Sequence, residues 1–176
     1  MSSSTSPKIK SAARIHLVCG GLGAGKSTHA NRIAAAHHAV RFAVDDWMQE
    51  LFGPDKPEMP TWPWVADRVQ RCERRIVAVA LQILSTGVDV VLELGLMRAA
   101  DRARAIASLG NRGYPLTVYW VQASEPVRRA RVAARNLQRG ETHSFEVTPA
   151  MFDAIERMYD GPTEHELEKG TVVEGE

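Results

Sequence analysis

Apolar and polar residues follow one another along this chain in blocks that predict alternating strands and helices. Short apolar runs predict buried strands, whereas longer segments with apolar residues three and four positions apart predict helices. Because the two kinds of block alternate, the pattern predicts a parallel sheet with crossover helices. The predicted strands are residues 15–19, 40–44, 88–92 and 116–121, with a last short strand at 171–173.

Glycine, proline and capping residues set the expected ends of the helices. A helix rich in alanine is predicted at 28–36, and a short one at 47–52. Residues 53–64 hold four prolines and predict a loop before a long helix that Gly87 ends. Further helices are predicted at 98–108, from the N-cap Ser124 onward, and from Thr148 to Tyr159, with a polar connection at 140–147.

The chain has 176 residues, a length that suggests one domain. Hydrophobic residues make up 44% of it, which is close to the average of globular proteins. The net charge of +1 gives no global attraction for nucleic acid or membrane, although a local basic groove stays open. No apolar run is long enough to span a membrane, and Cys19 and Cys72 fit buried thiols of a reducing compartment. We therefore expect a soluble cytoplasmic protein, with a disordered lead-in at 1–12 and one domain at 13–176.

The run GGLGAGKS at positions 20–27 lies between the first predicted strand and the first predicted helix. It fits the phosphate-binding P-loop pattern, in which glycine, four residues and Gly-Lys-Ser follow a strand. Glycines let successive N–H groups point at an anion, and the following helix adds its positive end. Lys26 would reach the phosphates, and Ser27 would ligate magnesium. The sequence thus predicts an ATP and Mg²⁺ site built from Gly21, Gly23, Ala24, Gly25, Lys26, Ser27 and Thr28.

Acidic residues stand at the ends of two predicted strands, where ligands bind in open parallel sheets. Glu93 ends the third strand and is the first candidate to anchor magnesium, with Asp89 as the second. Asp45 ends the second strand and could accept the proton of an attacking hydroxyl. The alternatives are a solvated strand end for Glu93, a turn residue for Asp89 and a helix N-cap for Asp45.

The helix after the fourth strand is strongly basic. Arg128, Arg131 and Arg135 recur at spacings of three and four, so they share one face. That face could cover a transferring phosphoryl group and neutralise its charge, or it could simply be a solvated basic face. Trp62 and Trp64 could stack on a ligand ring or cap an edge of the core. His29, His37 and His38 are predicted on a helix surface, and no His/Cys cluster has the spacing of a zinc site.

Several segments together resemble the small P-loop kinases grouped with the polynucleotide 5′-hydroxyl kinases, zeta-toxin-like kinases and chloramphenicol phosphotransferase. The similarity is greatest to single-domain AAA-type ATP-binding proteins of that group, and it covers roughly residues 14 to 165. The matching segments are 20–28, 44–48, 87–93, 98–102, 131–136, 148–159 and 161–163. One departure is Glu93, because the group typically has Asp at the end of the third strand.

This resemblance implies an adenylate-kinase-like α/β fold, in which a five-stranded parallel sheet is flanked by helices and a helical lid. It also implies that Asp45 activates the acceptor and that Arg131 and Arg135 are lid arginines. With Lys26, these are the predicted catalytic residues, while Ser27 and Glu93 are the predicted metal ligands.

Three functions are compatible with these residues. The first is a kinase that transfers the γ-phosphoryl of ATP to a hydroxyl on a small molecule or a nucleic-acid end. The second is a nucleotide-binding regulator or slow ATPase without an acceptor. The third is a nucleotide kinase with a phosphate acceptor, which the lack of arginine in residues 55–64 disfavours. Asp45 favours the first, but neither the acceptor nor the oligomeric state follows from the sequence.

Overall fold

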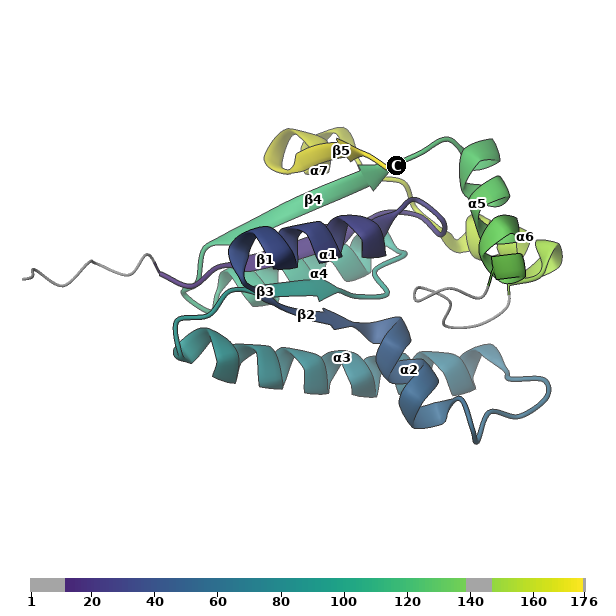
Figure 1. Ribbon diagram of the computed structural model, residues 1–176, viewed down its shortest axis with the longest axis horizontal. Helices are drawn as coiled ribbons and strands as arrows, with labels where there is room; N and C mark the ends of the chain where they lie inside the picture. The colour runs from purple at the N-terminus through teal and green to yellow at the C-terminus, as the bar shows by residue number, and fades with distance from the viewer. Residues whose placement is uncertain (1–11, 139–146, 176) are drawn as a thin grey trace, which may run out of the picture.

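Five parallel strands form a single sheet in the order β2-β3-β1-β4-β5 (Figure 1). The computed structural model describes residues 12–138 and 147–175. This sheet confirms the predicted fold class. Its strands are β1 (Ile15–Cys19), β2 (Val40–Ala43), β3 (Val90–Glu93), β4 (Leu116–Gln122) and β5 (Thr171–Glu174).

Helices cover both faces of the sheet and the edge where its strands end (Figure 1). Helix α1 packs on one face, and α3 and α4 pack on the other. Helices α5 and α6 lie together beyond the carboxyl ends of the strands, next to the loop that follows β1. The helices are α1 (Lys26–His37), α2 (Val44–Phe52), α3 (Trp62–Ser85), α4 (Ala99–Gly110), α5 (Glu125–Gln138), α6 (Pro149–Met158) and α7 (Glu164–Lys169).

Strand β1 lies at the centre of the sheet and is buried on both faces. Leu17 and Cys19 point toward α3 and α4, while Val18 packs under α1. A central parallel strand must be apolar on both sides because helices cover both faces. Burial raises the pKa of Cys19 to about 12. Cys19 and Cys72 are both free and buried, as expected of small apolar residues.

The structure shifts several predicted boundaries. Helix α2 begins at Val44 rather than Trp47, and α3 begins at Trp62, inside the predicted loop. The Thr61 side chain caps α3 by accepting a hydrogen bond from the backbone N–H of Trp64. Pro63, the last proline of the predicted loop, is the second residue of this helix. Helix α7 was not predicted; a capping box between Thr163 and Glu166 starts it.

Two of the predicted segments lie almost entirely outside the residues that the structure describes. The connection predicted at 140–147 is described only at Val147, and the lead-in predicted at 1–12 is described only at Ala12. The N-cap threonine predicted for the helix that follows the connection is confirmed, because Thr148 accepts a hydrogen bond from the backbone N–H of Met151.

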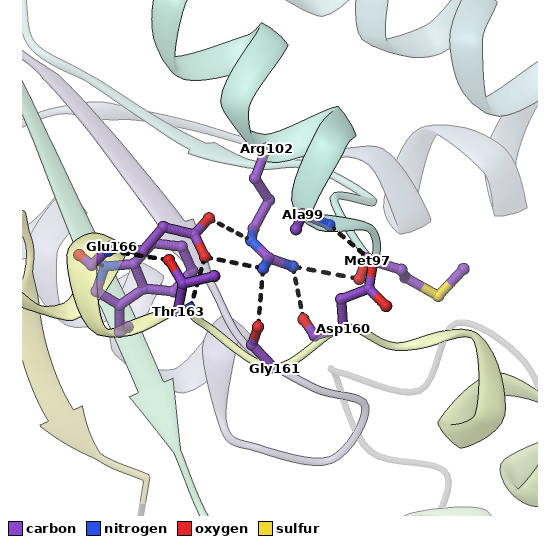
Figure 2. Close-up of polar contacts among 8 residues, drawn as sticks. Met97, Ala99, Arg102, Asp160, Gly161, Thr163 and Glu166 are labelled. Carbon is purple, nitrogen blue, oxygen red and sulfur yellow. Dashed lines mark hydrogen bonds and ion pairs between the residues drawn. The ribbon is translucent and has the colours of Figure 1, made fainter.

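A buried arginine joins α4 to the turn between α6 and α7 (Figure 2). The Arg102 guanidinium donates to the backbone oxygens of Met97, Asp160 and Gly161, and it forms an ion pair with Glu166 at 2.9 Å. Arg102 is 1% exposed. Because one planar cation satisfies three carbonyl groups and a carboxylate, it holds the turn in one position.

Candidate active site

The loop between β1 and α1 has the backbone geometry that the glycine pattern predicts. Gly23 and Gly25 have φ values of 75° and 99°, a region that other residues rarely adopt. A side chain at Gly23 would also come within 2.6 Å of the backbone oxygen of Arg128. Helix α1 starts immediately afterwards at Lys26, so its positive end faces the loop. These features fit a loop that surrounds a phosphate group.

Two side chains at the start of α1 provide the polar groups of this loop. Lys26 Nζ donates to the backbone oxygen of Gly21 at 3.1 Å, which holds the ammonium group along the loop. Ser27 Oγ donates to Glu93 Oε1 at 2.8 Å. The succession of strand, loop and helix thus brings a cation and a hydroxyl to the same opening.

Glu93, at the end of β3, is 6% exposed and links two partners. Its Oε1 accepts from Ser27, and its Oε2 accepts from Arg41 Nη2 at 2.8 Å. Hydroxyl and carboxylate oxygens are the ligands that Mg²⁺ prefers, so the pair formed by Ser27 and Glu93 fits that ion. Arg41 was not predicted as a site residue, because nothing in the sequence shows that β2 lies beside β3.

The alternative magnesium candidate, Asp89, lies at the other end of β3. It precedes the strand, and its Oδ1 accepts the backbone N–H of Arg14 at 2.9 Å. The carboxyl group of Asp89 is therefore separated from Ser27 by the length of the strand. Of the two candidates, only Glu93 lies beside the P-loop serine.

Asp45 lies in the first turn of α2 and not at its N-cap, which is Ala43. The N-cap interpretation of Asp45 is therefore wrong. Its side chain reaches the surface, yet the surrounding protein displaces enough water to raise the pKa of the carboxyl group. The charges of Lys26 and Arg135 act against this rise, and that of Glu93 acts with it. Asp45 thus shares one electrostatic environment with the P-loop lysine and the strand-end carboxylate.

Arg135, predicted as a lid arginine, lies in the last turn of α5, and its charge interacts with that of Asp45. Desolvation lowers the pKa of its guanidinium, and Asp45 partly offsets this effect. Its Nε is buried and has no hydrogen-bond partner among the described residues. A buried donor without a partner is costly, so this group is suited to bind an anion.

The other two arginines of the predicted basic face have protein partners. Arg131 Nη2 donates to the backbone oxygen of Gly175 at 2.9 Å, and Nη1 reaches Ala24 of the P-loop at 3.4 Å. Arg128, 7% exposed, forms a two-pronged ion pair with Glu156 of α6. Arg128 is thus structural, and the idea of one solvated basic face is wrong.

A cavity of about 620 Å³ opens beside the P-loop, between the ends of β4 and β5 and the start of α5. Its wall includes backbone of the P-loop at Gly21 and Ala24, together with Arg131. Tyr159 and Pro162, from the turn that Arg102 holds, and Gly175, after β5, complete it. None of these last three residues was predicted as a site residue, because Tyr159 and Pro162 reach the cavity through the turn that Arg102 holds, and Gly175 through the pairing of β5 with β4.

The two tryptophans near the start of α3 differ in their surroundings. Trp64 stacks on the Arg68 guanidinium, whose carbon lies 3.8 Å from the ring centroid, and its ring meets Phe52 of α2 edge-on. Trp62 is 52% exposed. Trp64 therefore joins α2 to α3, and Trp62 is the residue still available to contact a ligand.

The sheet, the loop and the side chains around it define a P-loop nucleotide-binding domain of the α/β class. Residues 15–162 match the model of the family described as AAA domain, and the chain belongs to that family. No curated protein matches the sequence of this chain.

Solved structures share the fold over almost the whole chain. A candidate kinase from Chloroflexus aurantiacus is 17% identical, with 93% of this chain and 87% of that chain covered and a TM-score of 0.69. Kti12 from Chaetomium thermophilum, solved with ADP-AlF3, is 14% identical, with 91% and 87% covered and a TM-score of 0.64. A gluconokinase from Sinorhizobium meliloti is 18% identical, with 93% and 83% covered and a TM-score of 0.53. These likenesses establish the fold.

Among the described residues, no helix is both long enough and apolar enough to cross a bilayer.

Proposed function

We propose that this protein is an ATP-dependent kinase that transfers the γ-phosphoryl group to a hydroxyl of a small molecule or a nucleic-acid end. The observation that carries the proposal is the shared environment of Asp45, Lys26, Glu93 and Arg135 at the mouth of the P-loop. A carboxylate repels phosphate unless a metal ion lies between them, and in this proposal Glu93 is the carboxylate that holds the metal. The presence of Asp45 among phosphate-binding cations is explained if it meets an acceptor hydroxyl.

In this proposal the P-loop amides and Lys26 bind the phosphates, while Ser27 and Glu93 hold Mg²⁺. The ion, when bound, would neutralise charge on the phosphate oxygens. The cavity beside Gly21 and Ala24 would take the base and ribose, because it adjoins the loop and its volume suits a small ligand. The fold is compatible with such binding, since the Kti12 structure was solved with ADP-AlF3.

Asp45 would accept the proton of the acceptor hydroxyl as its oxygen approaches the γ-phosphorus. Burial raises the pKa of Asp45, which makes it a stronger base than an ordinary carboxylate. Arg135 would donate to the phosphoryl oxygens, which gives its unpartnered Nε an acceptor. The acceptor would approach from the side of α2, where Asp45 lies in the first turn.

The competing proposals are a nucleotide-binding regulator or slow ATPase and a nucleotide kinase that phosphorylates a phosphate group. All three bind ATP, so binding does not separate them. We propose to incubate the protein with ATP, Mg²⁺ and a panel of sugars, antibiotics, nucleosides, nucleoside monophosphates and 5′-hydroxyl oligonucleotides. Mass spectrometry of the acceptors would then be compared with ADP release.

The proposal predicts that one acceptor class gains a phosphoryl group on a hydroxyl and that ADP release rises with it. Phosphorylation of a nucleoside monophosphate at its phosphate would contradict it. ADP release that no member of the panel stimulates, with inorganic phosphate as the product, would favour the ATPase.

A further inference from the structure

A second cluster of polar side chains lies at the opposite end of the sheet from the P-loop. It consists of His16 near the start of β1, His37 at the end of α1 and Asp89 just before β3. One ligand atom from each residue lies within 4.8 Å of the other two. His16 is 1% exposed, whereas the side chains of Asp89 and His37 are 22% and 46% exposed. The cluster is therefore anchored in the core and open to solvent on one side.

Hydrogen bonds from outside the cluster orient its atoms toward a common point. Asp89 Oδ1 accepts the backbone N–H of Arg14, which leaves Oδ2 to face His16 Nε2 at 3.4 Å and His37 Nδ1 at 3.9 Å. The other ring nitrogen of His16, Nδ1, lies 3.1 Å from the hydroxyl of Tyr119 on β4. Metal-binding histidines commonly have such a partner on the second nitrogen, because it fixes the ring and its tautomer.

We propose that His16, His37 and Asp89 form a binding site for a divalent transition-metal ion, with Zn²⁺ as the best fit. Two imidazole nitrogens and one carboxylate oxygen suit Zn²⁺, whereas Mg²⁺ prefers oxygen ligands alone. The open side at His37 leaves room for water as the fourth ligand. The site is distinct from the magnesium site at Ser27 and Glu93, and it does not depend on the proposed kinase activity.

The three ligand atoms lie within 4.8 Å of one another, so the His37 ring would have to move by up to about 1 Å to bring all three to one ion. Donors held about 2.0–2.2 Å from a tetrahedral ion lie roughly 3.3–3.6 Å apart. The separation of His16 and Asp89 already falls in this range, and that of His37 and Asp89 is a few tenths of an ångström larger. His37 is the last residue of α1, so its ring can move most easily. A bound ion would fasten the end of α1 to β1 and β3.

The simpler alternative is a hydrogen bond from His16 Nε2 to Asp89 without any ion. Zn²⁺ binding to the full chain, measured by competition with a chromophoric chelator in saturating Mg²⁺, separates the two. Saturating Mg²⁺ occupies the oxygen ligands of the P-loop, so Zn²⁺ binding there is suppressed. His37→Asn removes one ligand from an exposed position. The matched control is His38→Asn, because His38 is adjacent, exposed and outside the cluster, and Asn tolerates its φ of 50°.

The proposal predicts one Zn²⁺ per chain in the wild type and in His38→Asn, with a higher midpoint of thermal unfolding when Zn²⁺ is present. Loss of a direct ligand should weaken binding at least as much as loss of an outer partner does, so His37→Asn should cost about 100-fold or more in affinity. Tyr119→Phe should cost about 10-fold. No Zn²⁺ binding by the wild type in saturating Mg²⁺, or equal affinity of His37→Asn and His38→Asn, would overturn the proposal.

Discussion

Ser27 Oγ donates a 2.8 Å hydrogen bond to Glu93 Oε1, so the first turn of α1 and the end of β3 meet beside the P-loop. The two residues are 66 positions apart in the sequence. They come together because β3 is the neighbour of β1 in the sheet. We propose that Mg²⁺ binds at this contact, and a substitution of Glu93 alone tests that proposal.

Glu93→Gln should raise the Mg²⁺ concentration needed for half-maximal turnover by about tenfold or more, because the amide has no charge to attract the ion. Gln preserves the shape of the side chain; its amide oxygen can still accept from Arg41, while its NH2 group can donate to the Ser27 hydroxyl. Titration of turnover with Mg²⁺ measures the effect. Asp89→Asn, at the other end of β3, should leave the Mg²⁺ requirement unchanged. The reverse pattern would transfer the magnesium role to Asp89.

Lys26→Ala should weaken ATP binding by about 10- to 150-fold, since a hydrogen bond from a charged donor is worth roughly 1.5–3 kcal/mol. Isothermal titration calorimetry measures the affinity, and circular dichroism checks that the sheet and helices persist. Unchanged ATP affinity together with unchanged turnover would refute the phosphate-binding role of Lys26.

The arginines of α5 should separate into two kinetic classes. Arg135→Ala should lower kcat by about 10²–10³-fold with a smaller change in the KM for ATP, because it meets charge that develops in the transition state. Arg131→Ala should mainly raise the KM for ATP, since Arg131 lines the cavity and contacts the backbone of Ala24 and Gly175. The control is Arg129→Ala, whose guanidinium pairs with Glu125 and Asp153 on the surface. Wild-type kinetics in both Arg131→Ala and Arg135→Ala would contradict this account.

Arg102 and Glu166 should make folding sensitive to acid. The hydrogen bonds from Arg102 hold the pKa of Glu166 below its ordinary value. A carboxylate with a lowered folded-state pKa stabilises the protein fully above its unfolded-state pKa of about 4.3, and that contribution is lost as the pH falls through the folded-state value. Arg102→Met should cost about 3–5 kcal/mol at neutral pH, because it leaves Glu166 and three carbonyl groups without their partner.

Urea denaturation at neutral pH and below the usual carboxylate pKa measures both effects. The loss of stability on acidification should be smaller in Glu166→Gln than in the wild type, since the titrating group is gone while the side-chain shape remains. An equal loss in the two proteins would show that Glu166 contributes nothing to the acid sensitivity.

Local pattern was sufficient to predict the sheet and the P-loop. Apolar runs predict the central strands β1 and β3 because these are buried throughout, and the glycine pattern predicts the loop because other residues rarely adopt its dihedral angles. Gly23, Gly25, Lys26 and Ser27 could therefore be assigned from adjacent residues alone. The same logic correctly placed Glu93 at a strand end, whereas Asp45, predicted at the end of the second strand, lies in the first turn of α2; the roles of both residues are proposals.

Contacts between distant segments could not be predicted. Arg41 joins Glu93 only because β2 pairs with β3, and Tyr159 reaches the cavity only because Arg102 holds the turn after α6. The cluster of His16, His37 and Asp89 has no recognisable spacing, since a strand, a helix and a loop each supply one residue. Arg128 shares its helical face with Arg131, and only the position of Glu156 on α6 shows that it is structural.

The most direct test of the kinase proposal is phosphoryl transfer by Asp45→Asn, measured with whichever acceptor the panel identifies. Asn keeps the size of the side chain but accepts no proton, so transfer should fall by about 10²–10⁴-fold while ATP affinity and fold persist. Asp46→Asn is the matched control, because Asp46 lies in the same helical turn and loses the same interaction with the helix dipole. The wild-type pH profile should show an acid limb above the ordinary carboxylate pKa, since the pKa of Asp45 is raised, and Asp45→Asn should lack it. Full transfer activity in Asp45→Asn, equal to that of Asp46→Asn, would contradict the account.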